Sequence, residues 1–531
     1  MDLKRKEQQV GIAGRGDTAI EQALEYGSTE AADHNLRIAQ VIVPVLALAV
    51  FFGAAVGMGG KTFPFLAVGG MGGLILLFAP LRFVLGVFVI LTFLIVGPAR
   101  TIGHIAQAEM LPPMLALVLL IRVPMEWYHS STVRRGSYGA ANEGVSPIIW
   151  AVVLYFAVMA FSFAINRISP SQGLVGAKLY VFTWGIFFLL VVSSISPRDL
   201  ERLWRVVLLM GVLQFPFALY QRLFVVPSRA NALRVTALDA IVGTFGGTEL
   251  DGGANGAMCI FVLFSTALAV SLWRNKQLGG AAALLVVLAS VGSIALGEVK
   301  AIIVFIPLGF IVLNRREVLQ RPLYFIGMGL VVTTLLGAIF LLYADKSSGP
   351  SGRKLTLSEH LEKSFGYVLN PNEIHADRGG EVGRVAALNL WYRDGRRTPQ
   401  SVVLGYGPAA SHDSKLNRGE VASRHYPLVI NQTTAAGMLW DVGVLGFASF
   451  ATIMIVAFFQ AIKLANRTQI PPFHRGVLEA CAVLFALSIP YLPYDNDFLI
   501  TPQFQILFLV ALAHVVYWHS RAKGGACLTP Q

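Results

Sequence analysis

Long apolar runs separated by short polar segments occupy most of the 531-residue chain. A bilayer core about 30 Å thick needs roughly 20 apolar residues per helix, and runs of about this length recur throughout. The pattern predicts an all-α, polytopic membrane protein with about fourteen transmembrane helices, within a range of roughly 12–14. The expected spans are 39–58, 62–80, 83–98, 108–122, 147–165, 175–194, 203–224, 255–273, 278–296, 299–313, 323–343, 437–461, 475–493 and 498–518.

Basic residues fall in every second loop between these spans, which sets the expected orientation. Cytoplasmic loops carry an excess of Lys and Arg, so the basic segments before the first span and after the last place both termini in the cytoplasm. The chain then divides into a cytoplasmic N-terminal tail (1–38), transmembrane helices 1–11 (39–343), a large external loop (344–432), transmembrane helices 12–14 (433–520) and a cytoplasmic tail (521–531).

Composition supports this class and argues against several functions. Hydrophobic residues make up 55% of the chain and charged residues only 14%, and the net charge of +12 arises mainly from the basic loops. We therefore expect no nucleic-acid partner. The sequence has no GxxxxGK[ST] segment and no HExxH or His/Cys cluster, so we expect neither ATP-driven transport nor a metal or other cofactor.

The external loop is where water-side chemistry is expected, because nearly everything else in the chain is lipid-soluble. It holds GRVAALNLWYRDGRR and VLGYGPAASH, and RHYPLVINQTTAAGMLWDVGVLG runs from it into the next span. In the first segment Val385, Leu388 and Trp391 recur every three residues, which predicts an amphipathic helix on the membrane surface. Arg384 at its start would then point toward the bilayer interface.

Two further segments place charged residues among the apolar runs. An ionisable residue inside a span costs about 3 kcal/mol and usually lines a cavity. SIALGEVKAIIVF places Glu298 and Lys300 between two spans, where they either line an active cavity or cap a turn that meets water. The glycine-rich external loop before residue 255 carries Arg229 and Arg234. External arginines indicate an anionic ligand, and without a nucleotide motif a lipid-linked phosphate or pyrophosphate is favoured.

The order of these segments resembles the O-antigen polymerase and O-antigen ligase superfamily, bacterial integral-membrane glycosyltransferases of GT-C type. GTFGGTELDGGANGAM is similar to the family's Gly-x-Phe-Gly segment ending in Asn, here Asn255. GEVKA stands where many members have Ser-Arg-Gly-Ala, so Lys300 replaces the usual Arg. GRVAALNLWYRD followed by VLGYGPA resembles the family's Arg, Trp and Gly-x-Gly segment and carries the loop Arg onto Arg384.

The same segment assigns the turn glycines to Gly405 and Gly407, and DVGVLGF matches the Gly-x-x-Gly that opens the next span, at Gly443 and Gly446. One position departs from the ligases of the family. They typically carry a His followed by Asn, eleven residues before the glycine that corresponds to Gly443. This chain has Gln432 and then a threonine at these two positions. The displaced histidine favours a polymerase.

The resemblance implies that a glycan is transferred from undecaprenyl pyrophosphate to a hydroxyl of an acceptor sugar, on the periplasmic side of the bacterial inner membrane. A polymerase of surface polysaccharide (exopolysaccharide, capsule or O-antigen) uses another lipid-linked repeat unit as acceptor, and a ligase uses lipid A-core. The implied partners are the undecaprenyl-pyrophosphate-linked oligosaccharide, membrane lipid, and a chain-length regulator and flippase of the same pathway. A flippase or transporter of lipid-linked oligosaccharide is the alternative from another class.

The candidate site residues form three groups. Cations would neutralise the pyrophosphate leaving group, a general base would take the proton of the acceptor hydroxyl, and amides would orient sugar hydroxyls. The groups are Arg234, Lys300 and Arg384 for the pyrophosphate, Glu298, His425 and Asp441 for the base, and Asn255, Asn431 and Gln432 for the sugar. Asp441 has an alternative interpretation as a helix-start residue.

Overall fold

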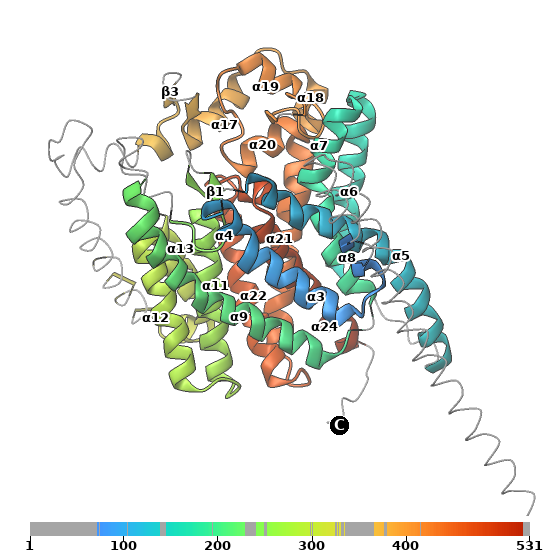
Figure 1. Cartoon of the computed structure of the whole chain (residues 1–531), viewed down its shortest axis with the longest axis vertical. Coiled ribbons are helices and arrows are strands. Elements are labelled where there is room, and N and C mark those ends of the chain that lie inside the picture. The colour runs from blue at the N-terminus through green and yellow to red at the C-terminus, as the bar shows by residue number, and fades with distance from the viewer. Residues whose placement is uncertain are drawn as a thin grey trace, which may run out of the picture. The chain divides into compact units, whose positions relative to one another are not determined.

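The structure is a computed structural model. It describes residues 72–137 except 74 and 104, 145–228 except 194, 241–248, 252–323 except 298 and 300, 327, 329, 330, 334, 366–375, and 380–523 except 415 (Figure 1). Packing divides the chain into two units, Met1–Val84 and Leu85–Gln531. The first unit is described only from residue 72, and the second holds nearly all of the elements.

Almost all elements of the described residues are helices, in the following order. The N-terminal part comprises α3 (Leu81–Ile90), η1 (Leu91–Ile95), α4 (Val96–Thr101), η2 (Ala106–Met110), α5 (Leu111–Ser137), α6 (Pro147–Asn166), α7 (Pro170–Tyr180), η3 (Phe182–Trp184), α8 (Gly185–Val192), α9 (Pro197–Tyr220), η4 (Gln221–Val225), α11 (Asn255–Arg274), α12 (Gly280–Gly297), α13 (Ile302–Leu313) and α14 (Arg315–Gln320). The C-terminal part comprises α17 (Arg384–Arg393), α18 (Pro399–Leu404), α19 (Glu420–His425), α20 (Thr434–Asp441), α21 (Gly443–Ala465), α22 (Pro472–Tyr491), α23 (Asp497–Ile500) and α24 (Pro502–Lys523).

Eight helical stretches within the described residues are long and apolar enough to cross a membrane, or up to nine if one bent pair is a single span. They are Leu81–Thr101, Ala108–Tyr128, Pro147–Asn166, Pro197–Ser228, Asn255–Arg274, Gly280–Gly297, Gly443–Ala465 and Pro472–Tyr491. The pair Pro170–Tyr180 and Phe182–Val192 bends by 43°. The fold is that of an all-α, multi-pass membrane protein.

These stretches compare as follows with the spans expected from the sequence. The eight overlap predicted spans, 175–194 is the bent pair, and 299–313 is the shorter helix α13. The span expected at 437–461 begins later, at Gly443, because residues 437–441 belong to the separate helix α20. The span expected at 498–518 lies in α24, which is long enough but is not among the eight apolar stretches. The spans expected at 39–58, 62–80 and 323–343 lie wholly or largely outside the described residues.

Serine followed by proline starts three of the helices. Ser146, Ser169 and Ser196 each adopt an extended conformation, and each hydroxyl accepts a hydrogen bond from a backbone N–H in the first turn. The proline that follows occupies the first helical position, where its missing N–H costs nothing. Local chemistry therefore fixes where α6, α7 and α9 begin.

The centre of the second unit is formed by α11 and α22, which pack against each other. In the most apolar part of each helix, 78% of the residues of α11 and 72% of those of α22 are buried. The corresponding share in the other six stretches is 39–44%. The outer helices carry large apolar side chains on their exposed faces, including Trp150 and Phe161 of α6. Such faces are expected where a helix borders lipid.

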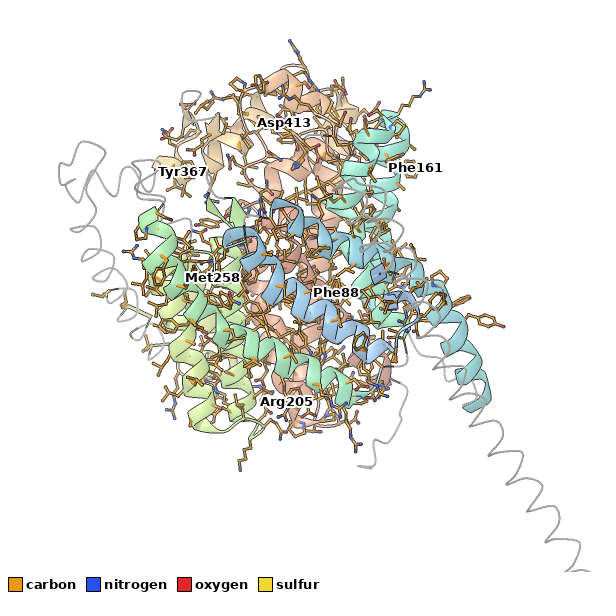
Figure 2. All side chains as sticks on the ribbon, viewed as in Figure 1. Phe88, Phe161, Arg205, Met258, Tyr367 and Asp413 are labelled. Carbon is orange, nitrogen blue, oxygen red and sulfur yellow. The ribbon has the colours of Figure 1, made fainter. Side chains whose placement is uncertain are left out.

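Helices α17 to α20 form a cap at one end of the second unit (Figure 1). Figure 2 shows Tyr367 and Asp413 at this end and Arg205 at the opposite end. Two short antiparallel hairpins lie in the chain, β1 (Gly247–Thr248) with β2 (Gly252–Gly253), and β3 (Ile374–His375) with β4 (Glu381–Val382). The second hairpin leads directly into α17.

The helix predicted at the start of the motif GRVAALNLWYRD is present as α17, and it packs against protein. Ala386 and Ala387 are buried and pack with Val382 and with Ala436 of α20. The residues expected to face the membrane, Val385, Leu388 and Trp391, are only partly buried. Leu388 nevertheless packs against the same cluster as the alanines, and Trp391 packs against a second cluster that holds Trp440. This helix therefore contacts protein through its alanines and through two of the predicted apolar residues.

Candidate functional site

Arg384, the first residue of α17, lies among Tyr367, Tyr494 and Asp495, a set of four residues that we call the Arg384 cluster. The guanidinium carbon is 3.9 Å from the ring centroid of Tyr494 and 5.7 Å from that of Tyr367. Its Nη1 lies 3.6 Å from Oδ2 of Asp495. The cluster joins the cap to the turn between α22 and α23.

The environment of Arg384 favours a bound anion. Its side chain is only 16% exposed. Burial by itself would lower the pKa of Arg384, but Asp495, followed by the neighbouring tyrosines, raises the pKa above its ordinary value. Its Nε is buried without a hydrogen-bond partner among the described residues. A buried N–H left unpaired costs free energy that a phosphate oxygen would recover.

The start of α11 lies directly against this cluster. Asn255 is the first residue of α11, and the β1–β2 hairpin precedes it. A Cβ added to Gly256 would lie 2.5 Å from the hydroxyl oxygen of Tyr491 and 3.2 Å from Oδ2 of Asp495. Only a glycine lets the helix approach so closely. The structure therefore brings the predicted Asn255 segment and the predicted Arg384 segment to the same place.

The start of α13 borders the same place. The ring of Phe305 lies 5.8 Å from that of Tyr491 and 5.7 Å from that of Tyr494. Two of the predicted site residues, Glu298 and Lys300, immediately precede α13 but lie outside the described residues, as does Arg234.

A second acid, Asp497, lies behind Asp495. It is 2% exposed, and its carboxylate accepts hydrogen bonds from the hydroxyls of Tyr491 and Thr501. Burial, followed by the charge of Asp495, raises the pKa of Asp497 above its ordinary value. The two carboxylates thus differ in environment: Asp497 is enclosed, and the side chain of Asp495 is 26% exposed beside a cation.

The predicted sugar ligand Asn431 belongs to a segment that is bonded to the same turn. Asn496 donates from Nδ2 to the carbonyl oxygen of Asn431 at 2.5 Å, and Thr434 donates from its N–H and its hydroxyl to the carbonyl oxygen of Asp495, both at 2.8 Å. The Nδ2 of Asn431 is paired with Nδ1 of His412 at 3.0 Å. Asn431 is therefore connected to the Arg384 cluster through backbone contacts.

The other two predicted residues of this segment lie nearby in sequence but have different surroundings. The ring of His425, at the end of α19, lies 5.4 Å from that of Trp440, and burial lowers the pKa of His425. Gln432 is partly buried beside Asn431. The histidine that approaches Asn431 is thus His412, which the sequence analysis did not select.

Asp441 is fully buried and holds a turn of the cap. Its carboxylate accepts from the hydroxyl of Tyr180 at 2.8 Å, from the N–H of Ala409 at 3.0 Å and from the N–H of Ser411 at 2.7 Å. Burial raises the pKa of Asp441 to about 6, although all three donors oppose the shift. The residue ends α20 and does not start a helix. These contacts describe a structural carboxylate better than a base that meets substrate.

The predicted turn glycines have the backbone conformations that the motif requires. Gly405, Gly407 and Gly443 have φ of 71°, 98° and 70°. A Cβ on Gly405 would lie 2.4 Å from the backbone of Asp441, and one on Gly443 would lie 2.5 Å from the N of Gly405. The LGYG and DVG segments therefore pack backbone against backbone, and α21 begins at Gly443 as predicted.

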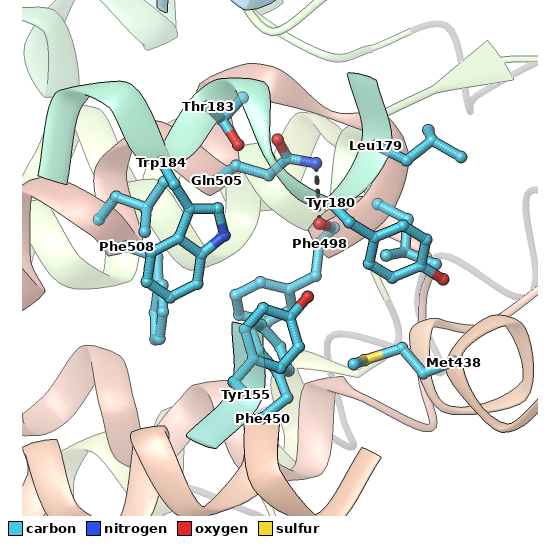
Figure 3. Close-up of a pocket in the computed structure, with 12 residues that line it drawn as sticks. Tyr155, Leu179, Tyr180, Thr183, Trp184, Met438, Phe450, Phe498, Gln505 and Phe508 are labelled. Carbon is cyan, nitrogen blue, oxygen red and sulfur yellow. Dashed lines mark hydrogen bonds between the residues drawn. The ribbon is translucent and has the colours of Figure 1, made fainter. Parts of the chain in front are cut away.

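A small internal cavity of about 20 Å³ lies near the bend between α7 and α8 (Figure 3). Tyr155, Tyr180 and Gln505 line it together with aromatic side chains, and Gln505 donates from Nε2 to the carbonyl oxygen of Phe498 at 2.8 Å. This volume suits a single water molecule and is far too small for a sugar ring. We therefore place the candidate site at the Arg384 cluster.

Comparison with known proteins leaves the family open: no family model and no curated protein matches the chain.

Four residues of the candidate site were not predicted from the sequence: Tyr491, Tyr494, Asp495 and Asp497. A signal for them exists in PYLPYDNDF, where two acids separate two apolar runs. This is the same criterion that selected Glu298.

Proposed function

We propose that the chain is a glycosyltransferase of the O-antigen polymerase and ligase type, acting as a polymerase of a bacterial surface polysaccharide. It transfers a glycan from undecaprenyl pyrophosphate to a lipid-linked repeat unit at the periplasmic face of the inner membrane. In this proposal the chain has fourteen spans, and α17 to α19 belong to the periplasmic loop at 344–432, which α20 follows.

The observation that carries the proposal is the buried, charged Arg384, whose Nε lacks a hydrogen-bond partner among the described residues. A planar guanidinium can bind two oxygens of a phosphate at once, and it stabilises the charge that develops on a leaving pyrophosphate. The tyrosines around it hold the guanidinium in one plane. Arg234 and Lys300 remain proposed as further pyrophosphate ligands, and Asn255 and Asn431 as sugar ligands.

A ligase is the second candidate, because His412 is paired with Asn431. Ligases of the family resembled carry a His followed by Asn, and here a histidine reaches the same segment from elsewhere in the chain. The acceptor would then be lipid A-core.

Deletion of the gene, followed by gel analysis of surface polysaccharide and extraction of lipid-linked repeats, tests the proposal. A polymerase mutant loses long chains but still displays single repeat units. A ligase mutant keeps polymer that stays on the lipid carrier. Lipid-linked repeats trapped on the cytoplasmic face would instead identify a flippase, and unchanged polysaccharide and lipid-linked pools would refute the proposal.

A further inference from the structure

The transfer proposed above needs a group that takes the proton from the acceptor hydroxyl as its oxygen attacks the donor sugar. Of the three bases expected from the sequence, His425 lies against Trp440, and Asp441 already accepts three hydrogen bonds. Glu298 lies outside the described residues. Neither His425 nor Asp441 contacts Arg384 among the described residues, and Arg384 is where the pyrophosphate would be held.

Asp495 is the carboxylate that does lie beside Arg384. Its Oδ2 is 3.6 Å from Nη1 of Arg384, and its Oδ1 accepts from the N–H of Asn496 at 2.8 Å. Its side chain is 26% exposed. An aspartate in an ion pair is a carboxylate, which is the form that accepts a proton.

The main chain of Asp495 is held in place, and α11 leaves room for its carboxylate. The Asp495 carbonyl oxygen is bound by both the N–H and the hydroxyl of Thr434. Gly256 at the start of α11 leaves room for Oδ2, because a Cβ there would lie 3.2 Å from it. Behind it Asp497 is enclosed by the hydroxyls of Tyr491 and Thr501. Of these two acids, Asp495 is the one with an oxygen toward both Arg384 and solvent.

We propose that Asp495 is the catalytic base of the transfer, with Asp497 and Tyr491 as positioning residues; this inference rests on the proposed function. The O–H bond of the acceptor breaks and its proton goes to a carboxylate oxygen of Asp495. The acceptor oxygen forms the new bond to C1 of the donor sugar. The bond between C1 and the pyrophosphate oxygen breaks, and that oxygen keeps the electron pair. Asp495 later releases the proton to water.

Arg384 then binds two anions in sequence, first the carboxylate of Asp495 and then the leaving pyrophosphate. Before the donor binds, Arg384 is paired with Asp495. The charge that develops on the leaving pyrophosphate attracts the same guanidinium, which removes the positive charge from Asp495 and makes its carboxylate a stronger base at the moment when the proton must be taken. Base and leaving group are thereby coupled through Arg384.

The test separates binding from turnover in the full-length protein. Asp495→Asn keeps the size of the side chain and its acceptor for the Asn496 N–H, but it cannot take a proton. Asp413→Asn is the matched control, since Asp413 forms an ion pair with Arg418 at 3.0 Å in the same cap and is 50% exposed. Polymer formation is measured in the deletion strain, and binding of undecaprenyl pyrophosphate to purified protein in nanodiscs is measured as Kd.

We expect Asp495→Asn to lower polymer formation by about 10²–10⁴-fold, the usual contribution of a general base. Undecaprenyl pyrophosphate should bind at least as tightly as to wild type, because the asparagine no longer competes for Arg384 as an anion. Asp413→Asn should leave both unchanged. Should Asp495→Asn be poorly folded, Asp495→Glu keeps the carboxylate, and we expect it to restore at least a tenth of the polymer.

Polymer near wild-type level in Asp495→Asn would overturn the inference. Loss of undecaprenyl pyrophosphate binding in step with loss of polymer, unrepaired by Asp495→Glu, would also overturn it and leave Asp495 a structural partner of Arg384. The proposed function fails separately, if the deletion itself leaves polymer and lipid-linked repeats unchanged.

Discussion

Arg384 and Asp495 form an ion pair, with Nη1 and Oδ2 3.6 Å apart. They lie far apart in the chain, Arg384 at the start of α17 and Asp495 between α22 and α23. The pair connects the cap to the turn that follows α22, one of the two central helices. It therefore places a cation and a carboxylate of the candidate site next to one of the two central helices.

Tyr494 should contribute to the site through its ring. The guanidinium of Arg384 lies 3.9 Å from the ring centroid, and such contacts contribute about 0.5–2 kcal/mol. Tyr494→Ala should therefore weaken binding of undecaprenyl pyrophosphate by roughly 2- to 30-fold, while Tyr494→Phe stays within about threefold of wild type. Equal losses in both variants would show that the hydroxyl matters and the ring does not.

Gly256→Ala should damage the site more than the fold. The new Cβ would lie 2.5 Å from the hydroxyl oxygen of Tyr491, so either that ring or the start of α11 must move. We expect polymer to fall at least about tenfold, since a misplacement of about 1 Å can cost 10² in rate. Gly86→Ala is the control, because a Cβ there meets nothing within 4 Å. Wild-type polymer from Gly256→Ala would contradict the close approach.

Asp441 should matter for stability. Asp441→Ala leaves the N–H groups of Ala409 and Ser411 and the hydroxyl of Tyr180 without their acceptor, and each unsatisfied group costs about 1–3 kcal/mol. We expect a clear drop in the melting temperature in detergent. Tyr180→Phe removes one donor only and should cost about 1 kcal/mol. A melting temperature of Asp441→Ala equal to that of Tyr180→Phe would contradict the three-donor arrangement.

His412 should make stability depend on pH. Burial, followed by the charge of Lys178, lowers the pKa of His412 from 6.5 to about 4. The unfolded chain therefore binds a proton more readily than the folded one between these values. The stability that comes from keeping the ring neutral is fully present above pH 6.5 and is lost as the pH falls toward 4, by up to about 3 kcal/mol.

The measurement is the melting temperature in detergent at pH 7.5 and pH 5, for the wild type and for His412→Gln. The glutamine keeps a partner for Asn431 but does not titrate. The wild type should lose more stability than the variant between the two pH values, and an equal loss would show that His412 is not responsible. The comparison with His412→Gln is needed because burial raises the pKa of Asp441. The contribution of Asp441 to stability is therefore lost as the pH rises through this range, opposite to that of His412.

Much of the helical framework could be predicted from the sequence, because length, apolarity and Ser-Pro starts act locally. The turn glycines at 405 and 407 were predicted from the resemblance of this segment to a family motif, and both have a positive φ that few other residues adopt. The buried face of α17 could not be predicted. The fully buried residues of α17 are Ala386 and Ala387, and alanine contributes too little to a hydrophobic pattern to stand out beside Val385 and Leu388.

The site itself was predicted in part. Its cation and the start of α11 came from sequence segments that the structure brings together. Asp495 and Tyr494 were missed because their role depends on a contact between segments far apart in the chain, and nothing local to PYLPYDNDF indicates which arginine it meets. The predicted Arg234, Glu298 and Lys300 lie outside the described residues, so they stay predictions.

The most direct test of the central claim is the amount of surface polymer, together with the amount of lipid-linked repeat unit, in a deletion strain that carries Arg384→Ala or Arg393→Ala. Both changes remove one arginine from α17, but Arg384 is buried in the cluster and Arg393 is exposed at the end of the helix. We predict that Arg384→Ala lowers polymer by about 10²–10³-fold while lipid-linked repeats accumulate, and that Arg393→Ala behaves as wild type. Wild-type polymer with Arg384→Ala would contradict the claim.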